Sequence, residues 1–183
     1  MGVRDDDLKK LRHYAKSLGI KLIFKKQPRG DWSGANWDFG DPMKPKIIVH
    51  TWPRQSKTCV ILMLLHEFGH HLDWIHNDKT ISEEERKALE LESERTHRSA
   101  PIIDKTLRAA ILRSELRGID YMDVIAKELD IKLPLWKVKA DQDLDRWTYT
   151  HYFKTGNMPT LKQIKEASKE IRRKYNENIK RKG

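Results

Sequence analysis

The chain has 183 residues, a formal net charge of +10 and a single cysteine. This length suits one ordinary domain with a sizeable core, and one cysteine excludes both a disulfide framework and a zinc ribbon built on paired Cys-x-x-Cys motifs. The N-terminus lacks the layout of a signal peptide and the longest apolar run is too short to cross a bilayer, so we expect a soluble cytoplasmic protein without a membrane partner.

The first fifty residues predict a helix followed by strands. Residues 5–18 carry an apolar stripe at helical spacing, and Gly19 is a plausible C-cap. Residues 20–24 are typical of a strand, and the turn-rich, aromatic residues 28–44 predict a long hairpin or loop. Residues 46–50 have the β-branched centre of a second strand, which is either an edge strand for an extended peptide substrate or part of the sheet core.

A helix expected from Gln55 to about Asn77 contains the most informative motif. Seven apolar residues, from Cys59 to Leu65, precede His66-Glu67-Phe68-Gly69-His70, which has the form H-E-x-x-H. Residues four apart share one face of a helix, so both histidines can bind one Zn²⁺ at about 2.0–2.1 Å. Burying these polar groups without partners is costly, which favours a metal site over a solvated helix end.

The residues beside the two histidines suggest further roles. Glu67 is placed to act as the general base for a water molecule that the metal activates. Asp73 lies near the same face, where it could orient a ligand histidine or serve as a substitute ligand. Other divalent ions also suit a site made of two histidines and a carboxylate.

We expect the third metal ligand to lie further along the chain than His70. A helix expected over residues 102–129 has a core-facing stripe formed by Ile103, Leu107, Ile111, Glu115, Gly118, Met122, Ile125 and Leu129. A buried carboxylate needs a cation or a metal, which makes Glu115 the candidate ligand; an internal Arg or Lys partner, or a break in the helix, is the alternative. Glu92 and Glu94, on a charged surface helix expected over residues 82–98, are the other candidates.

The C-terminal region is aromatic and basic. Residues 135–153 are rich in aromatic side chains, and a capping box at residues 160–163 predicts the start of a last amphipathic helix. The final thirty residues hold ten Lys or Arg and three Glu, an excess of seven positive charges. Such a segment is usually a solvated face, but it can also attract nucleic acid. The candidate contacts are Lys169, Arg172, Arg173 and Lys174.

The motif His66 to His70, followed by a helix that bears Glu115 and Gly118, resembles the small gluzincin-type metallopeptidases. These proteins, which include the ImmA/IrrE-like group, are common in bacteriophages and mobile elements. The resemblance implies an α+β fold with a small mixed sheet packed on the H-E-x-x-H helix and a glutamate helix, over residues 1–133. Residues 134–183 match no family and are expected to dock as a helical basic extension.

These features together predict a zinc-dependent peptidase that holds one Zn²⁺ and cleaves a protein or peptide in the cytoplasm, the host cytoplasm if the chain is phage-encoded. The H-E-x-x-H motif supplies two of the expected zinc ligands. The presence of Glu67 as a general base favours an enzyme that turns over a substrate. The alternative is a nucleic-acid-associated or regulatory zinc-binding module without turnover, suggested by the basic C-terminal segment.

Overall fold

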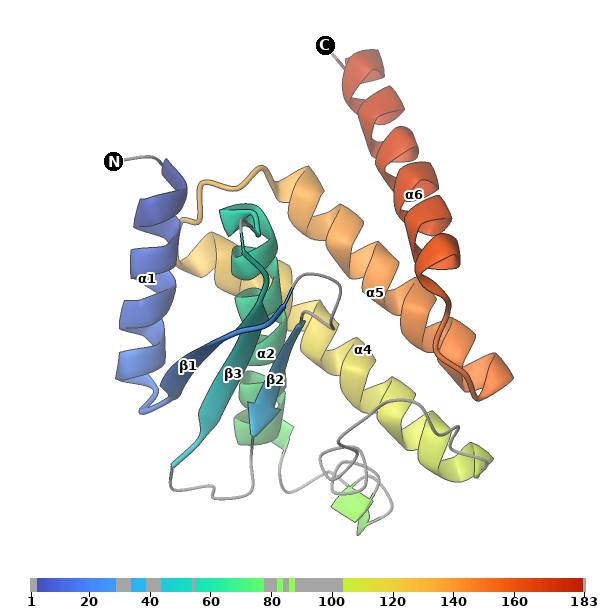
Figure 1. The fold of residues 1–183 in the computed structure, drawn as a ribbon, viewed down its shortest axis with the longest axis horizontal. Helices are drawn as coiled ribbons and strands as arrows, with labels where there is room; N and C mark the ends of the chain where they lie inside the picture. The colour runs from blue at the N-terminus through green and yellow to red at the C-terminus, as the bar shows by residue number, and fades with distance from the viewer. Residues whose placement is uncertain are drawn as a thin grey trace.

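The computed structural model describes residues 3–28, 34–38, 44–53, 55–77, 82–83, 86–87 and 104–182 (Figure 1). Its elements, in chain order, are α1 (Val3–Ser17), β1 (Lys21–Lys26), β2 (Gly34–Asp38), β3 (Lys46–Thr51), α2 (Lys57–Asn77), α4 (Lys105–Glu128), α5 (Leu135–Thr155) and α6 (Leu161–Lys182). The expected charged helix over residues 82–98 and the candidate ligands Glu92 and Glu94 fall largely or wholly outside these described residues.

The strands form one mixed sheet in the order β1-β3-β2, and the predicted α+β class is confirmed. β1 pairs with β3 in parallel from Lys21 opposite Lys46, whereas β2 pairs with β3 antiparallel from Gly34 opposite His50. Because β3 has a neighbour on both sides, the suggestion that residues 46–50 form an edge strand is wrong. Ile47 and Val49 are fully buried, as expected of the central strand.

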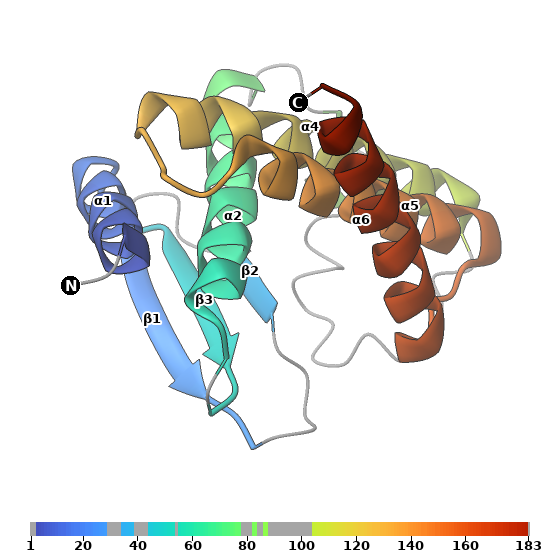
Figure 2. The ribbon, with the colours of Figure 1, turned by 90° about the horizontal axis from the view of Figure 1, so that it is seen from above.

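α2 is the centre of the core. Figures 1 and 2 show it crossing the sheet beside α1, and it packs against α1, β2, β3 and α4. Its apolar run contributes Ile61, Leu64 and Leu65, all fully buried, and Phe68 packs edge-on against Tyr14 of α1. Burying an apolar helix between a sheet and a second helix removes most of its surface from water, which stabilises the arrangement.

α2 begins at Lys57, two residues later than expected. The Ser56 hydroxyl accepts a hydrogen bond from the Cys59 N–H at 3.2 Å, and the side chain of Gln55 instead accepts one from the Trp52 N–H at 3.0 Å. Ser56 therefore caps the helix, because a serine at this position satisfies one of the backbone donors that a helix start leaves unpaired.

α4 contains the predicted stripe. Asp104 caps it by accepting hydrogen bonds from the N–H groups of Thr106 and Leu107 at 2.7 and 3.3 Å. The buried face of α4 includes Ile111, Gly118, Met122 and Ile125. Glu115 shares this face, and its side chain is only 13% exposed. The helix is continuous through Gly118, so the alternative of a break there is wrong.

α5 and α6 complete the described structure as successive layers, with α5 packed on α4 and α6 on α5 (Figure 2). Val138 and Tyr149 of α5 belong to the same hydrophobic core as the sheet and α2. α6 starts with the predicted capping box, in which the Thr160 N–H donates to the Gln163 side chain at 2.8 Å. Among the described helices, none has the length and apolar composition needed to cross a bilayer.

Candidate metal centre

Three side chains from two helices converge on one point. The Nε2 atoms of His66 and His70 are 2.9 Å apart, and each lies 3.2 Å from Oε2 of Glu115. Only 12–13% of each side chain is exposed. The structure thus brings together a His-His-Glu group that could hold a metal ion, with Glu115 beside both histidines.

The distances within this group fit a small tetrahedral ion. Bonds of about 2.0–2.1 Å from a zinc ion give separations of about 3.3–3.4 Å between ligand atoms. The three observed separations, 2.9–3.2 Å, are slightly shorter than this. A tetrahedral ion held by these three donors would have room for one further ligand, as a catalytic zinc site has and a closed structural one does not.

The electrostatics of the group favour a cation. Burial alone would lower the pKa of His66, but hydrogen bonds with Asp145 and Glu115 raise that pKa well above its ordinary value. Burial alone would raise the pKa of Glu115, yet the nearby His70 and hydrogen bonds with both histidines lower that pKa far below its ordinary value. The carboxylates of Asp145 and Glu115 thus stabilise positive charge at the histidines, and a metal ion would take the place of the proton that carries this charge.

Two glycines let α2 and α4 approach closely enough to form the group. A Cβ added at Gly69 would lie 2.0 Å from the backbone oxygen of Gly118, and one added at Gly118 would lie 2.7 Å from Nδ1 of His70. Both distances are far below ordinary contact, so a side chain at either position forces the helices or the ring apart. The sequence placed Gly118 in the core-facing stripe of this helix, and the structure gives the steric reason why that position has no side chain.

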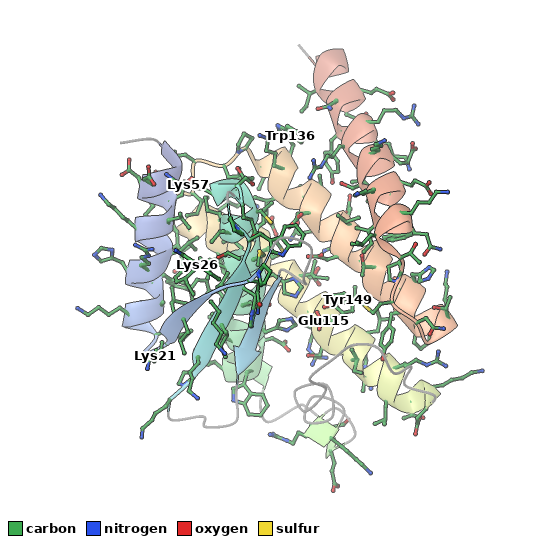
Figure 3. The ribbon with its side chains drawn as sticks, viewed as in Figure 1. Lys21, Lys26, Lys57, Glu115, Trp136 and Tyr149 are labelled. Atoms are coloured by element: carbon green, nitrogen blue, oxygen red, sulfur yellow. The ribbon has the colours of Figure 1, made fainter. Side chains whose placement is uncertain are left out.

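α5 supplies two residues that sequence analysis did not identify. Nδ1 of His66 lies 3.1 Å from Oδ2 of Asp145, and its ring stacks on Tyr149 with ring centroids 6.4 Å apart. Tyr149 and Glu115 are labelled together in Figure 3, between α2, α4 and α5. Since a carboxylate can only accept, Nδ1 donates the hydrogen bond, which leaves Nε2 of a neutral His66 with its lone pair facing the group.

The sequence contains a pattern that could have identified Asp145 and Tyr149 as neighbours on one helix face. Residues 135–155 contain neither glycine nor proline, and Asp141, Asp145 and Tyr149 recur every four residues. Such spacing places them on one face of a helix. Burial and the charge of Asp145 raise the pKa of the Asp141 carboxyl to about 7.

Asp73 lies on α2, where its carboxylate pairs with Arg117 of α4. Nε of Arg117 donates to both carboxylate oxygens, at 2.9 and 3.0 Å, and the Asp73 side chain is only 4% exposed. This ion pair joins α2 to α4 next to the histidines. The carboxylate that the structure places beside Nδ1 of His66 is that of Asp145.

The general-base candidate Glu67 directly follows His66 and is buried, with 7% of its surface exposed. Tyr121, one of several side chains able to stabilise an oxyanion, instead lies 3.2 Å from Nδ1 of the more distant His76. Tyr152, another such side chain, packs in a separate apolar cluster with Ala110 and Ile111.

The four basic candidates for nucleic-acid contact lie on α6 and are exposed. Two of them pair within the helix: Arg173 with Glu170 and Glu177, and Lys174 with Glu170. Arg172 is close enough to Asp141 to influence the ionisation of that carboxyl. Part of the charge excess of α6 is therefore balanced by acidic neighbours.

Comparisons of this chain with protein-family models, with curated proteins and with solved structures found no match. The class of the site is accordingly defined by its own residues: a largely buried His-His-Glu group on two packed helices, with a glutamate following the first histidine.

Proposed function

We propose that this chain is a zinc-dependent peptidase in which His66, His70 and Glu115 hold the ion. The convergence of three donor atoms on largely buried side chains, none more than 3.2 Å from another, carries the proposal. Bound Zn²⁺ would supply Lewis acidity, polarising a peptide carbonyl and lowering the pKa of water to about 7.

The remaining steps belong to side chains of the chain. Asp145 accepts a hydrogen bond from the Nδ1–H group of His66 and so holds that ring in one tautomer and orientation. Glu67 takes a proton from the attacking water and delivers it to the leaving amine, which is the role of a general base followed by a general acid. A structural metal site has no need of such a glutamate, so its presence favours turnover over a regulatory module.

Metal content tests the first half of this proposal. Inductively coupled plasma mass spectrometry on protein purified without chelator should find about one zinc per chain in the wild type. His70→Ala and Glu115→Ala should both lose the ion, whereas Asp143→Ala, on the part of α5 that contacts α6, should keep it. A wild type without metal, or zinc retained in His70→Ala, would refute the site.

Turnover tests the second half. A proteome-derived peptide library digested with the zinc-loaded wild type and read by mass spectrometry should show new termini, which Glu67→Gln should not produce although it retains zinc. Cleavage that is equal in the two proteins would show that Glu67 is not the base. Zinc binding without any cleavage would favour the alternative of a regulatory metal-binding module.

Nucleic-acid binding through α6 is a second candidate, supported by the excess of seven positive charges over residues 154–183. Binding driven by phosphate contacts weakens steeply with salt, and Lys169→Glu should reduce that slope. Affinity for DNA that is absent, or insensitive to salt, would remove this candidate.

A further inference from the structure

β1 has a free backbone edge in the part of the chain that the structure describes. It lies at one end of the sheet, next to β3 only. The N–H groups of Lys21 and Gln27 donate to Pro45 and Thr51 on the side of β3, at 3.0 and 2.9 Å. Because backbone groups alternate along a strand, the N–H and C=O groups of the intervening even-numbered residues, such as Phe24, point to the other side. An edge of this kind can pair with a further strand.

A hollow of about 580 Å³ lies beside this edge, between α1 and β1. Its floor is apolar and includes Ala15 and Ile20, which are 2% and 5% exposed. Phe24 lines it with 42% of its surface exposed, so part of the ring is open to a ligand. The hollow therefore offers apolar contacts immediately next to unpaired backbone groups.

The charged residues that line the hollow are all basic. Arg12 and Lys16 from α1 line it, Lys21 borders it at the start of β1 with its side chain on the opposite face of the strand from Phe24, and no acidic residue is among its lining residues. The Arg12 guanidinium lies 5.6 Å from the centre of the Phe24 ring, so it stays near the edge of the strand. Lys25 and Lys26 continue the exposed basic series along β1. A partner that fills this space must bring negative charge.

The hollow is separate from the His-His-Glu group. Figure 3 labels Lys21 near one side of the molecule and Glu115 beyond α2 towards the other. The sheet order also places β1 on the far side of β3 from β2. Occupation of the hollow is thus compatible with an open metal centre.

We propose that the free edge of β1 and the adjoining hollow bind an extended, acidic segment of a partner protein as an added strand. Phe24 and Val49 share a register position and hence a face of the sheet, the face on which α1 and α2 lie. Alternate residues of the added strand would face the hollow, where apolar side chains fit, while the others would face Lys21 and Lys25, where carboxylates fit. Main-chain pairing supplies affinity and the alternating side chains supply specificity.

A nucleic acid is the competing ligand for so basic a surface. It would use the cations and could stack on Phe24, but it cannot pair with the backbone edge or bring aliphatic side chains to the apolar floor. The edge and the floor therefore favour a peptide, and the experiment below separates the two ligands by their dependence on backbone pairing.

Fluorescence anisotropy of the full chain with a short fluorescein-labelled peptide of alternating glutamate and valine tests the proposal. The same peptide methylated at alternate backbone nitrogens keeps its charge but cannot pair with a strand edge, and a lysine-for-glutamate peptide reverses the charge. Oligothymidylate of matched charge is the nucleic-acid probe. We expect only the unmethylated acidic peptide to bind with measurable affinity.

Variants of the chain show where the acidic peptide binds. Lys21→Glu should weaken the peptide complex by about tenfold or more, because it places like charges together, whereas Lys165→Glu on α6 should leave the affinity unchanged. Phe24→Pro removes an outward N–H without removing a bond to β3, and it should weaken binding beyond Phe24→Ala, which loses only the ring. His70→Ala should bind the peptide as wild type does, which makes this test independent of the metal centre.

The outcomes are distinct. Loss of binding on methylation and in Lys21→Glu supports strand addition at β1. Equal binding of the methylated peptide, or tighter binding of oligothymidylate that is unaffected by Phe24→Pro, overturns it in favour of a purely electrostatic surface. No binding of the acidic peptide at low salt also overturns it.

Discussion

Gly118 lies against the His70 ring. Replacing Gly118 with alanine tests how strongly the packing of α4 controls the geometry of the metal centre. The added Cβ would lie 2.7 Å from Nδ1, 2.8 Å from Cε1 and 3.1 Å from Cγ of His70. Ordinary contact begins at 3.4 Å, so the ring or the helix must move by about 0.7 Å. Functional side chains must be held within about 0.5 Å of their working positions.

We expect Gly118→Ala to weaken zinc binding by about 10–100-fold, the range seen when the immediate support of a metal ligand is removed. The metal-free protein should change less in stability. Overpacking costs about 1–3 kcal/mol, but alanine gains about 1 kcal/mol over glycine inside a helix. Zinc affinity is measured by competition with a chromophoric chelator, and stability by urea unfolding of chelator-treated protein.

Two further variants make the reasoning refutable. In a His70→Ala background the clash is absent, so adding Gly118→Ala should stabilise the metal-free protein by about 1 kcal/mol instead of destabilising it. Gly69→Ala differs because its Cβ would meet the backbone oxygen of Gly118 at 2.0 Å, so it should damage both folding and zinc binding. Unchanged zinc affinity in Gly118→Ala, or equal destabilisation in both backgrounds, would refute this account.

Three other predictions concern the surroundings of the group. Asp145→Ala should weaken zinc binding by about 10–100-fold, because Nδ1 of His66 loses its acceptor; affinity equal to that of Asp143→Ala would contradict this. Removing zinc should lower the melting temperature by about 10 °C, since ion at about 1,000 times its Kd adds about 4 kcal/mol, and calorimetry with and without chelator measures the shift. The third concerns pH: the folded chain holds the Asp141 proton more tightly than the unfolded chain, so this carboxyl lowers the free energy of unfolding as pH rises from 3.8 to about 7. Asp141→Asn should lessen that decline in urea unfolding of metal-free protein, and parallel curves for variant and wild type would count against it.

Local sequence patterns were sufficient to locate α1, α2, α4 and α6 and the candidate ligands, although they did not identify α5 as a helix. The H-E-x-x-H spacing places two histidines on one helical face, whatever the rest of the chain does. The stripe that contains Glu115 identified a carboxylate on the buried side of α4, because helical periodicity is set by local backbone geometry. Serine, threonine and aspartate caps are local as well, and the capping box at Thr160 formed as expected.

The role of α5 could not be read from such patterns. Its aromatic residues are spread around the helix, so it lacks the one-sided apolar stripe that identifies an amphipathic helix. Asp145 reaches His66 across 79 positions of sequence, and nothing local to either residue specifies that contact. The position of β3 between β1 and β2 likewise depends on pairing between distant segments.

The sequence by itself thus determined which side chains share a face on each helix: His66 with His70 on α2, and Glu115 with the buried stripe of α4. Only the tertiary structure decided that these faces meet, through the close approach of Gly69 to Gly118, and that Asp145 supports the first histidine. The physical reason is that spacing along a helix follows from the backbone alone. Contact between helices depends on how all their side chains pack together.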